Sequence, residues 1–278
     1  MDQHPPNRDQ ALETDGHQAL VAASAAHIKV QDLSMRYGHK VIQKHLNFTV
    51  NRQDIFILMG GSGCGKSTLL KHMFGLYQPY QGQVLVNDLS LWDASVDKRR
   101  RMMQGFGVSY QAGALVSSLT LAQNVGMPLE IYTDRSAAEV RELVELKLAM
   151  VGLTGSEDLY PAEISGGMLK RAALARAIAL DPEILFFDEP SAGLDPITAR
   201  RLDDLILELS ASLKSTIVIV THELASIFSI GTNAVFLDAE TKTMLAYGPP
   251  KELLESCEQP KVQEFLRRGE KPSKRALV

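Results

Sequence analysis

The chain has 278 residues, of which 45% are hydrophobic and 22% are charged. This length allows one large α/β domain with a well-buried core, or such a core with a smaller subdomain. With 29 basic and 33 acidic residues, the formal charge is −4. No global positive field therefore favours nucleic acid or anionic lipid, and we expect no nucleic-acid partner.

The sequence pattern also argues against export and against membrane-spanning helices. The longest apolar runs, such as Ile184 to Phe187 and Ile217 to Val220, are strand-sized. Met1 to His4 lack the basic start of a secretory signal, and the two cysteines are too few for a disulfide framework. We expect a soluble intracellular protein that, if it serves a membrane, does so from outside the bilayer.

In the first third of the chain, the composition and the hydrophobic pattern change near residue 28. Residues 1–26 are rich in Asp, Gln, His, Pro and Ala without a period, which predicts a mobile tail. Residues 28–33 and 45–50 alternate between apolar and polar side chains, which predicts half-buried antiparallel strands. Residues 55–59 are continuously apolar, as in a strand buried on both faces, and a helix is predicted over 67–74.

The middle of the chain is predicted to contain a helical insertion. Short strands are predicted over 83–86 and 106–110, separated by a polar stretch that ends in Lys98 to Arg101. Residues 119–162 look wholly helical, because apolar side chains recur there near helical spacing. We interpret residues from about 112 to 164 as a helical subdomain inserted into the α/β core.

After residue 164, helices and strands alternate, which predicts a parallel sheet with right-handed crossovers. The predicted helices are 165–180, stopped by Asp181-Pro182, and 196–213; the predicted strands are 184–187 and 216–220, followed by a hairpin of 235–237 with 244–247. We place one domain over 27–257 and a C-terminal extension over 258–278. Val262, Phe265 and Leu266 give this extension an apolar stripe, which we expect to dock on a neighbouring subunit.

Residues 60–67 complete a phosphate-loop pattern, Gly-Gly-Ser-Gly-Cys-Gly-Lys-Ser, between a buried strand and a helix. Glycines let backbone N–H groups converge on phosphates, and the helix N-terminus adds partial positive charge. Lys66 is expected to reach the β- and γ-phosphates, and the Ser67 hydroxyl to bind Mg²⁺. The alternative is a glycine turn that binds nothing, which the complete match disfavours. The predicted nucleotide-binding residues here are Gly60, Gly61, Ser62, Gly63, Cys64, Gly65, Lys66, Ser67 and Thr68.

A second pattern places two carboxylates at the end of the buried strand over 184–187. Open α/β sheets bind ligands at the carboxyl ends of their strands. We expect Asp188 to hold Mg²⁺ and Glu189 to be the general base that polarises the attacking water. A solvated acidic turn is the alternative for either residue alone, but two adjacent acids after an apolar run favour the catalytic interpretation.

Further polar residues lie where the same sheet edge should gather them. Gln111 and His222 each follow a predicted strand, and Asp195 closes the segment Ser191 to Asp195. Tyr37 follows the first strand, where its ring could stack on adenine or pack at a turn. Each residue alone is more often structural, so their combination carries the assignment. In addition, Ser165-Gly166-Gly167 opens a basic, alanine-rich helix well after the phosphate loop.

At these residues the chain closely resembles the ATP-binding subunits of ABC transporters, over roughly residues 28–254. The resemblance implies a P-loop NTPase of the ABC ATPase fold, with a RecA-like parallel-sheet core, an antiparallel β subdomain and the inserted helical subdomain. It also implies an ATPase that binds ATP and Mg²⁺. Tyr37 is similar to the family's adenine-stacking residue, and Asp195 to its D-loop aspartate. Gln111 resembles the Q-loop residue that touches Mg²⁺, and His222 resembles the catalytic switch histidine.

The resemblance also implies that a second copy of the chain is a partner. Ser165, Gly166 and Gly167 resemble the signature motif, which contacts the γ-phosphate held by the opposite subunit of a head-to-tail dimer. ATP then favours the closed dimer because both halves contact it, and hydrolysis lets the dimer open. That cycle would drive the membrane permease subunits.

Met168 stands where most members of the family carry Gln, and with Lys170-Arg171 it resembles the signature of MlaF-type ATPases of bacterial phospholipid transport. The region Asn124 to Leu129 and the basic C-terminal extension are also similar to that group. The partners this implies are MlaE-like permease subunits, a small MlaB-like STAS protein and an MlaD-like MCE-domain protein. The implied function is phospholipid transport that maintains outer-membrane lipid asymmetry, from the cytoplasmic face of the bacterial inner membrane.

Two other functions stay open at this point. ATPase subunits of amino-acid or other small-solute importers have a similar length and are the nearest rival. A soluble ABC-type ATPase acting on DNA or ribosomes is less favoured, because the chain has neither a long coiled-coil insertion nor a second cassette. Lys98 to Arg101 could touch lipid headgroups, although a solvated face fits the acidic total better. Cys64 is interpreted as a tolerated small residue and not as a redox switch.

Overall fold

The computed structural model describes residues 26–268. Of the N-terminal tail predicted over residues 1–26, therefore, only Ala26 falls within the described part, where it begins the first strand. The basic end of the predicted C-terminal extension, with Lys271, Lys274 and Arg275, also lies outside the described residues.

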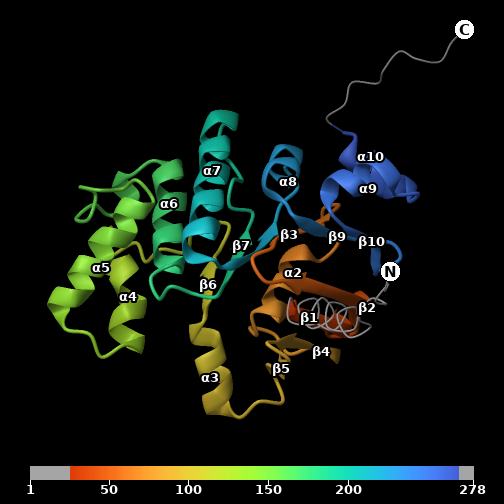
Figure 1. The fold of residues 1–278 in the computed structure, drawn as a ribbon, viewed down its shortest axis with the longest axis horizontal. Helices are drawn as coiled ribbons and strands as arrows, with labels where there is room; N and C mark the ends of the chain where they lie inside the picture. The colour runs from red at the N-terminus through yellow and green to blue at the C-terminus, as the bar shows by residue number, and fades with distance from the viewer. Residues whose placement is uncertain (1–25, 269–278) are drawn as a thin grey trace, which may run out of the picture.

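The centre of the fold is a six-stranded sheet in the order β10-β9-β3-β8-β7-β6 (Figure 1). Its strands are β3 (Ile55–Gly60), β6 (Phe106–Ser109), β7 (Ile184–Asp188), β8 (Thr216–Val220), β9 (Asn233–Leu237) and β10 (Met244–Gly248). All neighbours pair in parallel except β10, which pairs antiparallel with β9. The predicted parallel sheet and its closing hairpin are thus confirmed.

Both faces of this sheet are covered, as the continuous apolar runs predict. Along β3, Ile55, Ile57 and Met59 pack into the core beneath the helices, whereas Phe56 and Leu58 pack into a second core. The second core lies under a four-stranded antiparallel sheet in the order β2-β1-β4-β5. Its strands are β1 (Ala26–Tyr37), β2 (Lys40–Asn51), β4 (Gln81–Val86) and β5 (Leu89–Ser90), and α2 (Lys66–Met73) contributes to the same core.

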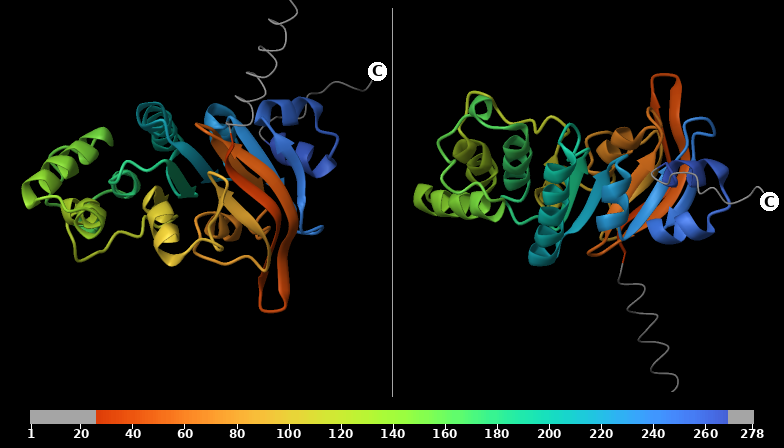
Figure 2. Two further views of the ribbon diagram at one scale, coloured as in Figure 1. Left: turned by 60° about the horizontal axis from the view of Figure 1, so that its bottom comes forward. Right: turned by 90° about the horizontal axis from the view of Figure 1, so that it is seen from above.

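Helices cover the other face and extend beyond it. They include α6 (Gly166–Ala177), α7 (Pro196–Leu213), α8 (Leu224–Ile230), α4 (Leu121–Tyr132) and α5 (Ala137–Met150). Figure 1 and both views of Figure 2 place α4 and α5 at one end of the molecule, far from the C-terminal helices. Across residues 26–268, no helix combines the length and apolar character that crossing a bilayer requires.

The segment predicted to be wholly helical contains two helices separated by capped turns. The side chain of Thr120 accepts a hydrogen bond from Gln123 N at the start of α4, and Ser136 accepts one from Glu139 N at the start of α5. Each is the N-cap of a capping box, which fixes where a helix begins. The prediction is therefore wrong between the two helices and again after α5, where residues 151–160 form turns and loops. The boundaries of the helical subdomain, about 112–164, stay a prediction.

The polar stretch before β6 forms a helix that we did not predict, α3 (Val96–Gln104). Ser95 caps it by accepting a hydrogen bond from Lys98 N, and none of its side chains is buried. A helix without a buried face shows no apolar periodicity, which is why the pattern gave no signal.

The predicted docking of the C-terminal apolar stripe on a neighbouring subunit is wrong. Residues 250–256 and 260–266 form α9 (Pro250–Ser256) and α10 (Pro260–Leu266). Val262, Phe265 and Leu266 on α10 are buried in the core of their own chain. The ring of Phe265 packs edge-on against Phe236 of β9, with centroids 5.3 Å apart. The stripe is thus used within the subunit, where it fixes α10 against the sheet.

Phe265→Ala should lower the free energy of unfolding by about 3–5 kcal/mol, because it removes a buried ring and leaves a cavity. The neighbouring Arg267→Ala, which changes an exposed side chain, should change it by less than about 0.5 kcal/mol. Urea unfolding of the full chain measures both values. Equal and small effects of the two substitutions would contradict the packing of α10 described above.

Candidate functional site

The loop between β3 and α2 is built so that only glycine fits at key positions. Gly60 has φ 144°, and a Cβ there would lie 2.3 Å from the carbonyl oxygen of Leu237. Gly65 has φ 102°, and a Cβ there would lie 2.6 Å from a side-chain carbon of Ile42. Both close approaches let the loop fold tightly over the N-terminus of α2, whose partial positive charge favours an anion.

Lys66 folds back over this loop. Its Nζ donates hydrogen bonds to the carbonyl oxygens of Gly60, at 2.9 Å, and Gly61, at 3.0 Å. The side chain is buried against the loop, so its ammonium is held at the centre of the turn. A cation in this place adds to the positive field of the helix N-terminus.

Ser67 and Asp188 meet across the sheet edge. The Ser67 hydroxyl donates to Asp188 Oδ1 at 2.7 Å, which joins the start of α2 to the end of β7. Hydroxyl and carboxylate oxygens are the hard donors that Mg²⁺ prefers, commonly one or two from protein with the rest from phosphate and water. Accordingly, the described residues contain no cluster of three or more His, Cys, Asp or Glu suited to a metal held by protein alone. The donor pair fits a Mg²⁺ that shares a phosphate ligand.

Glu189 and His222 form a second pair at the same edge. His222 Nδ1 lies 2.8 Å from Glu189 Oε1, within hydrogen-bonding distance. Glu189 has φ 50°, a left-handed conformation that non-glycine residues rarely adopt, and its backbone N–H is held by Val220 O at 2.9 Å. Its other oxygen, Oε2, is buried and has no hydrogen-bond partner within the described structure. An ionisable group with one oriented oxygen and one unpaired oxygen can accept a proton.

One cavity of about 610 Å³ gathers most of the predicted nucleotide residues. Lys66, Ser67 and Thr68 line it from α2, while Gln111, Glu189 and His222 come from three strand ends. Tyr37 contributes a ring that is 50% exposed, with its hydroxyl 3.4 Å from Thr68 Oγ1. The full predicted set that lines this cavity is Tyr37, Gly60, Gly61, Ser62, Gly63, Gly65, Lys66, Ser67, Thr68, Gln111, Glu189 and His222.

The structure places four of the predicted residues elsewhere. Ser165, Gly166, Gly167 and Asp195 line a second cavity of about 760 Å³ and do not line the first. Ser165 is the N-cap of α6, since its Oγ accepts a hydrogen bond from Met168 N at 3.3 Å. Asp195 likewise caps α7 by accepting from Ile197 N and Thr198 N, both at 3.1 Å. The predicted site residues of one chain thus fall into two groups that line different cavities.

Two residues noted in the sequence have simple packing explanations. Met168 is partly buried against the helical core, where a thioether packs well and an amide would need a polar partner. Cys64 is buried within the phosphate loop, and burial raises the pKa of its thiol above the ordinary value. A protonated buried thiol is unreactive, which agrees with the interpretation of Cys64 as a tolerated small residue.

Sequence reasoning missed three residues that border the first cavity, namely Ile42, Phe265 and Arg268. Ile42 lies in β2, where it is one of many residues in an extended pattern. Phe265 and Arg268 come from α10 and the turn after it, distant from every motif. Only the fold brings them to the phosphate loop, so no local signal could have identified them.

Comparison with known proteins agrees with this geometry. Residues 43–192 match the family described as ABC transporter. The intermembrane phospholipid transport system ATP-binding protein MlaF of Haemophilus influenzae is 38% identical over 240 residues, which cover 86% of this chain and 90% of that protein. The probable ribonucleotide transport ATP-binding protein mkl of Mycobacterium tuberculosis is 38% identical over 239 residues, 86% of this chain. The chain spans only 66% of the length of that mycobacterial relative.

Solved structures show the same fold. The chain superposes on cbiO1 from Clostridium perfringens, part of an ABC transporter complex, with a TM-score of 0.76 and 26% identity, over 84% of this chain and 92% of that one. It superposes on the dimeric ABC transporter cassette MJ0796 with a TM-score of 0.73 and 27% identity, over 80% and 98% of the two chains. The family resemblance and the α/β P-loop fold predicted from the motifs are both confirmed, and the chain belongs to the ABC transporter family, among its ATP-binding proteins.

Proposed function

We propose that this chain is the ATP-hydrolysing subunit of an ABC transporter, and that it powers phospholipid transport linked to outer-membrane lipid asymmetry. One observation carries the proposal of hydrolysis: a complete phosphate loop, the Ser67–Asp188 pair and the Glu189–His222 pair converge at one sheet edge. The name of the Haemophilus influenzae relative supports the phospholipid part. A location on the cytoplasmic face of the bacterial inner membrane follows from that part.

ATP binding would use the phosphate loop and the first strand. The adenine ring would stack on Tyr37, and the phosphates would accept hydrogen bonds from the loop N–H groups of residues 60–68. Lys66 would exchange the carbonyls that it now holds for β- and γ-phosphate oxygens. Ser67, Asp188 and Gln111 would hold Mg²⁺, which neutralises developing charge on the phosphates when bound.

Hydrolysis would use Glu189 as the general base. Glu189 lines the nucleotide cavity and would take a proton from water there, while His222 keeps Oε1 in position. The water oxygen then bonds to the γ-phosphorus, the bond to the bridging oxygen breaks, and its electron pair stays on ADP. The left-handed backbone of Glu189 would orient the carboxylate toward this water.

A second copy would complete each site. The half-site at Ser165, Gly166 and Gly167 lines a different cavity from the phosphate loop, so it needs a nucleotide brought by another chain. A Cβ at Gly166 would meet no atom within 4 Å, so the backbone there faces open space into which a phosphate can come. ATP bound between two copies in a head-to-tail dimer would stabilise the closed state through contacts with both.

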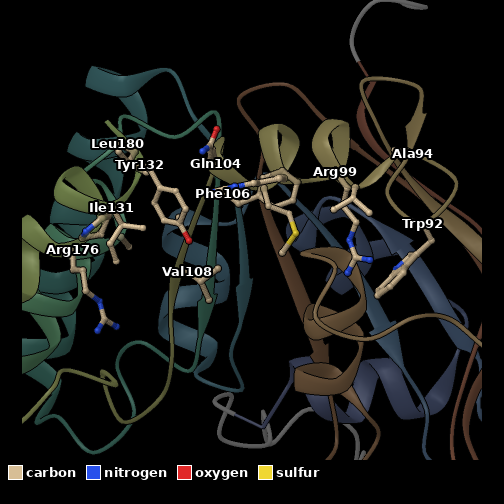
Figure 3. Close-up of a pocket in the computed structure, with 16 residues that line it drawn as sticks. Trp92, Ala94, Arg99, Gln104, Phe106, Val108, Ile131, Tyr132, Arg176 and Leu180 are labelled. Carbon is tan, nitrogen blue, oxygen red and sulfur yellow. The ribbon is translucent and has the colours of Figure 1, made fainter. Parts of the chain in front are cut away.

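The permease partner would use a groove of about 890 Å³ between α3 and the layer of α4 and α6 (Figure 3). Figure 3 shows Ile131, Tyr132 and Arg176 on one side and Arg99 with Trp92 on the other. The Arg99 guanidinium lies 3.5 Å from the centre of the Trp92 ring. The lining includes Arg99, Arg100 and Arg176 but no Asp or Glu, although the whole chain is acidic. The groove therefore suits an apolar permease segment that carries acidic side chains.

Two further partners extend the proposal, a small MlaB-like STAS protein and an MlaD-like MCE-domain protein. They rest on the likeness to MlaF. The name of the mycobacterial relative, which specifies ribonucleotide transport, favours a solute transporter instead. The identity of the permease decides between the two cargoes, because cargo choice lies in the membrane subunits.

Lys66→Ala should abolish ATP turnover, with a loss of at least about 10²-fold in kcat, because it removes the cation that stabilises charge on the transferred phosphoryl group. Phosphate release from the purified full chain measures this. Lys71→Ala, which changes a half-buried lysine of the same helix that does not line the nucleotide cavity, is the control and should keep wild-type turnover. Unchanged turnover in Lys66→Ala would refute hydrolysis at this loop.

Glu189→Gln should slow hydrolysis by about 10²–10⁴-fold, because the amide cannot accept the proton of the attacking water. ATP should stay bound, and the dimer should accumulate, since no hydrolysis reopens it. Size-exclusion chromatography with ATP, together with single-turnover kinetics, checks both results. Rapid turnover, or an ATP complex that stays monomeric, would count against the base assignment or the dimer respectively.

Arg100→Glu should reduce co-purification of the permease by about tenfold or more, because it places a like charge opposite the acidic side chains expected in the groove. Arg101→Glu on the same helix makes the same charge change outside the groove and should leave co-purification intact. Detergent extraction with the tagged full chain, followed by mass spectrometry, gives both readings and names the permease. Equal recovery with the two variants would remove the groove as the docking site.

A further inference from the structure

Lys170, in the second turn of α6, links the two half-sites within one chain. It is only 9% exposed, and its Nζ donates a hydrogen bond to the backbone carbonyl of Gln111. The side chain of Gln111 lines the nucleotide cavity. The backbone of Gln111 is thereby joined to the helix that begins with Ser165, Gly166 and Gly167.

Keeping Lys170 charged in this buried position costs desolvation free energy. Burial lowers its pKa below the ordinary value, and the carboxylate of Glu189 acts in the opposite direction. The residues that follow it on α6, from Ala172 to Ala175, are apolar and buried. An apolar side chain at residue 170 would avoid the desolvation of a cation, and such replacements are often neutral or stabilising. Packing alone therefore does not explain a lysine here.

The rest of the turn after β6 is fastened to the same helix. Arg176 donates to the carbonyl oxygens of Ala114, at 2.6 Å, and Gly113, at 2.9 Å. Gly113 has φ 75°, and a Cβ there would lie 2.7 Å from a Leu169 side-chain carbon, so the turn packs directly on α6. Lys170 holds the end of this turn that faces the nucleotide, and Arg176 holds the other end.

We propose that Lys170 is a positioning residue that couples Gln111 to the signature loop. Because the Lys170 hydrogen bond joins the backbone of Gln111 to α6, a nucleotide bound against the Gln111 side chain fixes the placement of Ser165 to Gly167 for the nucleotide of the partner copy. Lys170 itself does not line the nucleotide cavity. The proposal rests on the proposed function, since it requires ATP to bind at the phosphate loop and two copies to share it.

The test compares Lys170→Met, which removes the charge and the donor at similar volume, with Lys170→Arg, which keeps both. Lys170→Met should lower kcat by about 10-fold to 100-fold, because reacting groups shift by a fraction of an ångström to an ångström. Its Kd for a fluorescent ATP analogue should stay within about twofold, since direct nucleotide contacts are untouched. Its Tm should not fall, and Lys170→Arg should recover most of the lost kcat.

Dimerisation supplies a readout that a structural role would not move. In the Glu189→Gln background, Lys170→Met should weaken ATP-driven dimer formation, as measured by size-exclusion chromatography of the full chain. The matched control is Lys147→Met, which removes another buried lysine, paired with Asp181 and away from Gln111. That variant should keep both kcat and dimer formation.

Three outcomes would overturn the proposal. These are an unchanged kcat and dimer in Lys170→Met, a loss of kcat that Lys147→Met shares, and a loss explained by a lower Tm that Lys170→Arg does not restore. The proposed function is tested separately, by ATP hydrolysis in the wild type and by the loss of hydrolysis in Lys66→Ala. If the wild type hydrolyses ATP and the Lys170→Met variant is fully active, the coupling role is refuted while the proposed function is not.

Discussion

The phosphate loop and the acid and histidine groups at the nucleotide cavity depend on the parallel pairing of β3, β8 and β7. In that pairing Leu58 lies opposite Val220, and Val220 lies opposite Asp188, so the three strands end at the same level. The phosphate loop, His222 and the Asp188-Glu189 pair then emerge side by side from separate parts of the chain. Because side chains alternate along a strand, a shift of one residue in either pairing would turn these carboxylates away. The apolar side chains on both faces of the sheet hold the register.

The predicted site residues of the chain fall into two groups that line different cavities. Ser165 and Asp195 cap α6 and α7, so each serves its own helix in the single chain. Their cavity is separate from that of Lys66 and Glu189. An N-cap leaves further helix N–H groups unpaired at the same end, and these can meet an anion that arrives from outside. The same residues can therefore stabilise the fold and complete a second subunit's site.

Much of the fold and of the site could be predicted, because the deciding signals are local. Continuous apolar runs such as Ile184 to Phe187 require a strand buried on both faces, and the glycines around Lys66 require a tight turn. The rest depends on contacts between distant segments. The helix α3 has no buried face. The apolar stripe on α10 packs in the core of its own chain, although the same pattern would suit packing against another chain. Sequence periodicity shows that a face is apolar but not which surface covers it, so Phe265 and Arg268 at the cavity were not foreseeable.

The helix α6 lies between the groove, the helical layer and the nucleotide cavity. Its basic side chains hydrogen-bond to backbone carbonyls of the neighbouring segments. Arg171 donates to the carbonyls of Val151 and Gly152 at the end of α5, whereas Lys170 and Arg176 hold the turn after β6. Arg176 also lines the groove that we propose binds the permease. An acidic side chain bound there would compete with the carbonyls of Gly113 and Ala114 for the same guanidinium. Release of those carbonyls would loosen the turn after β6, which carries Gln111. A ligand in the groove and a nucleotide at the phosphate loop would therefore both act on this turn. Coupling between permease and ATPase would then need no long-range rearrangement of the sheet, whose strands stay fixed by their two cores.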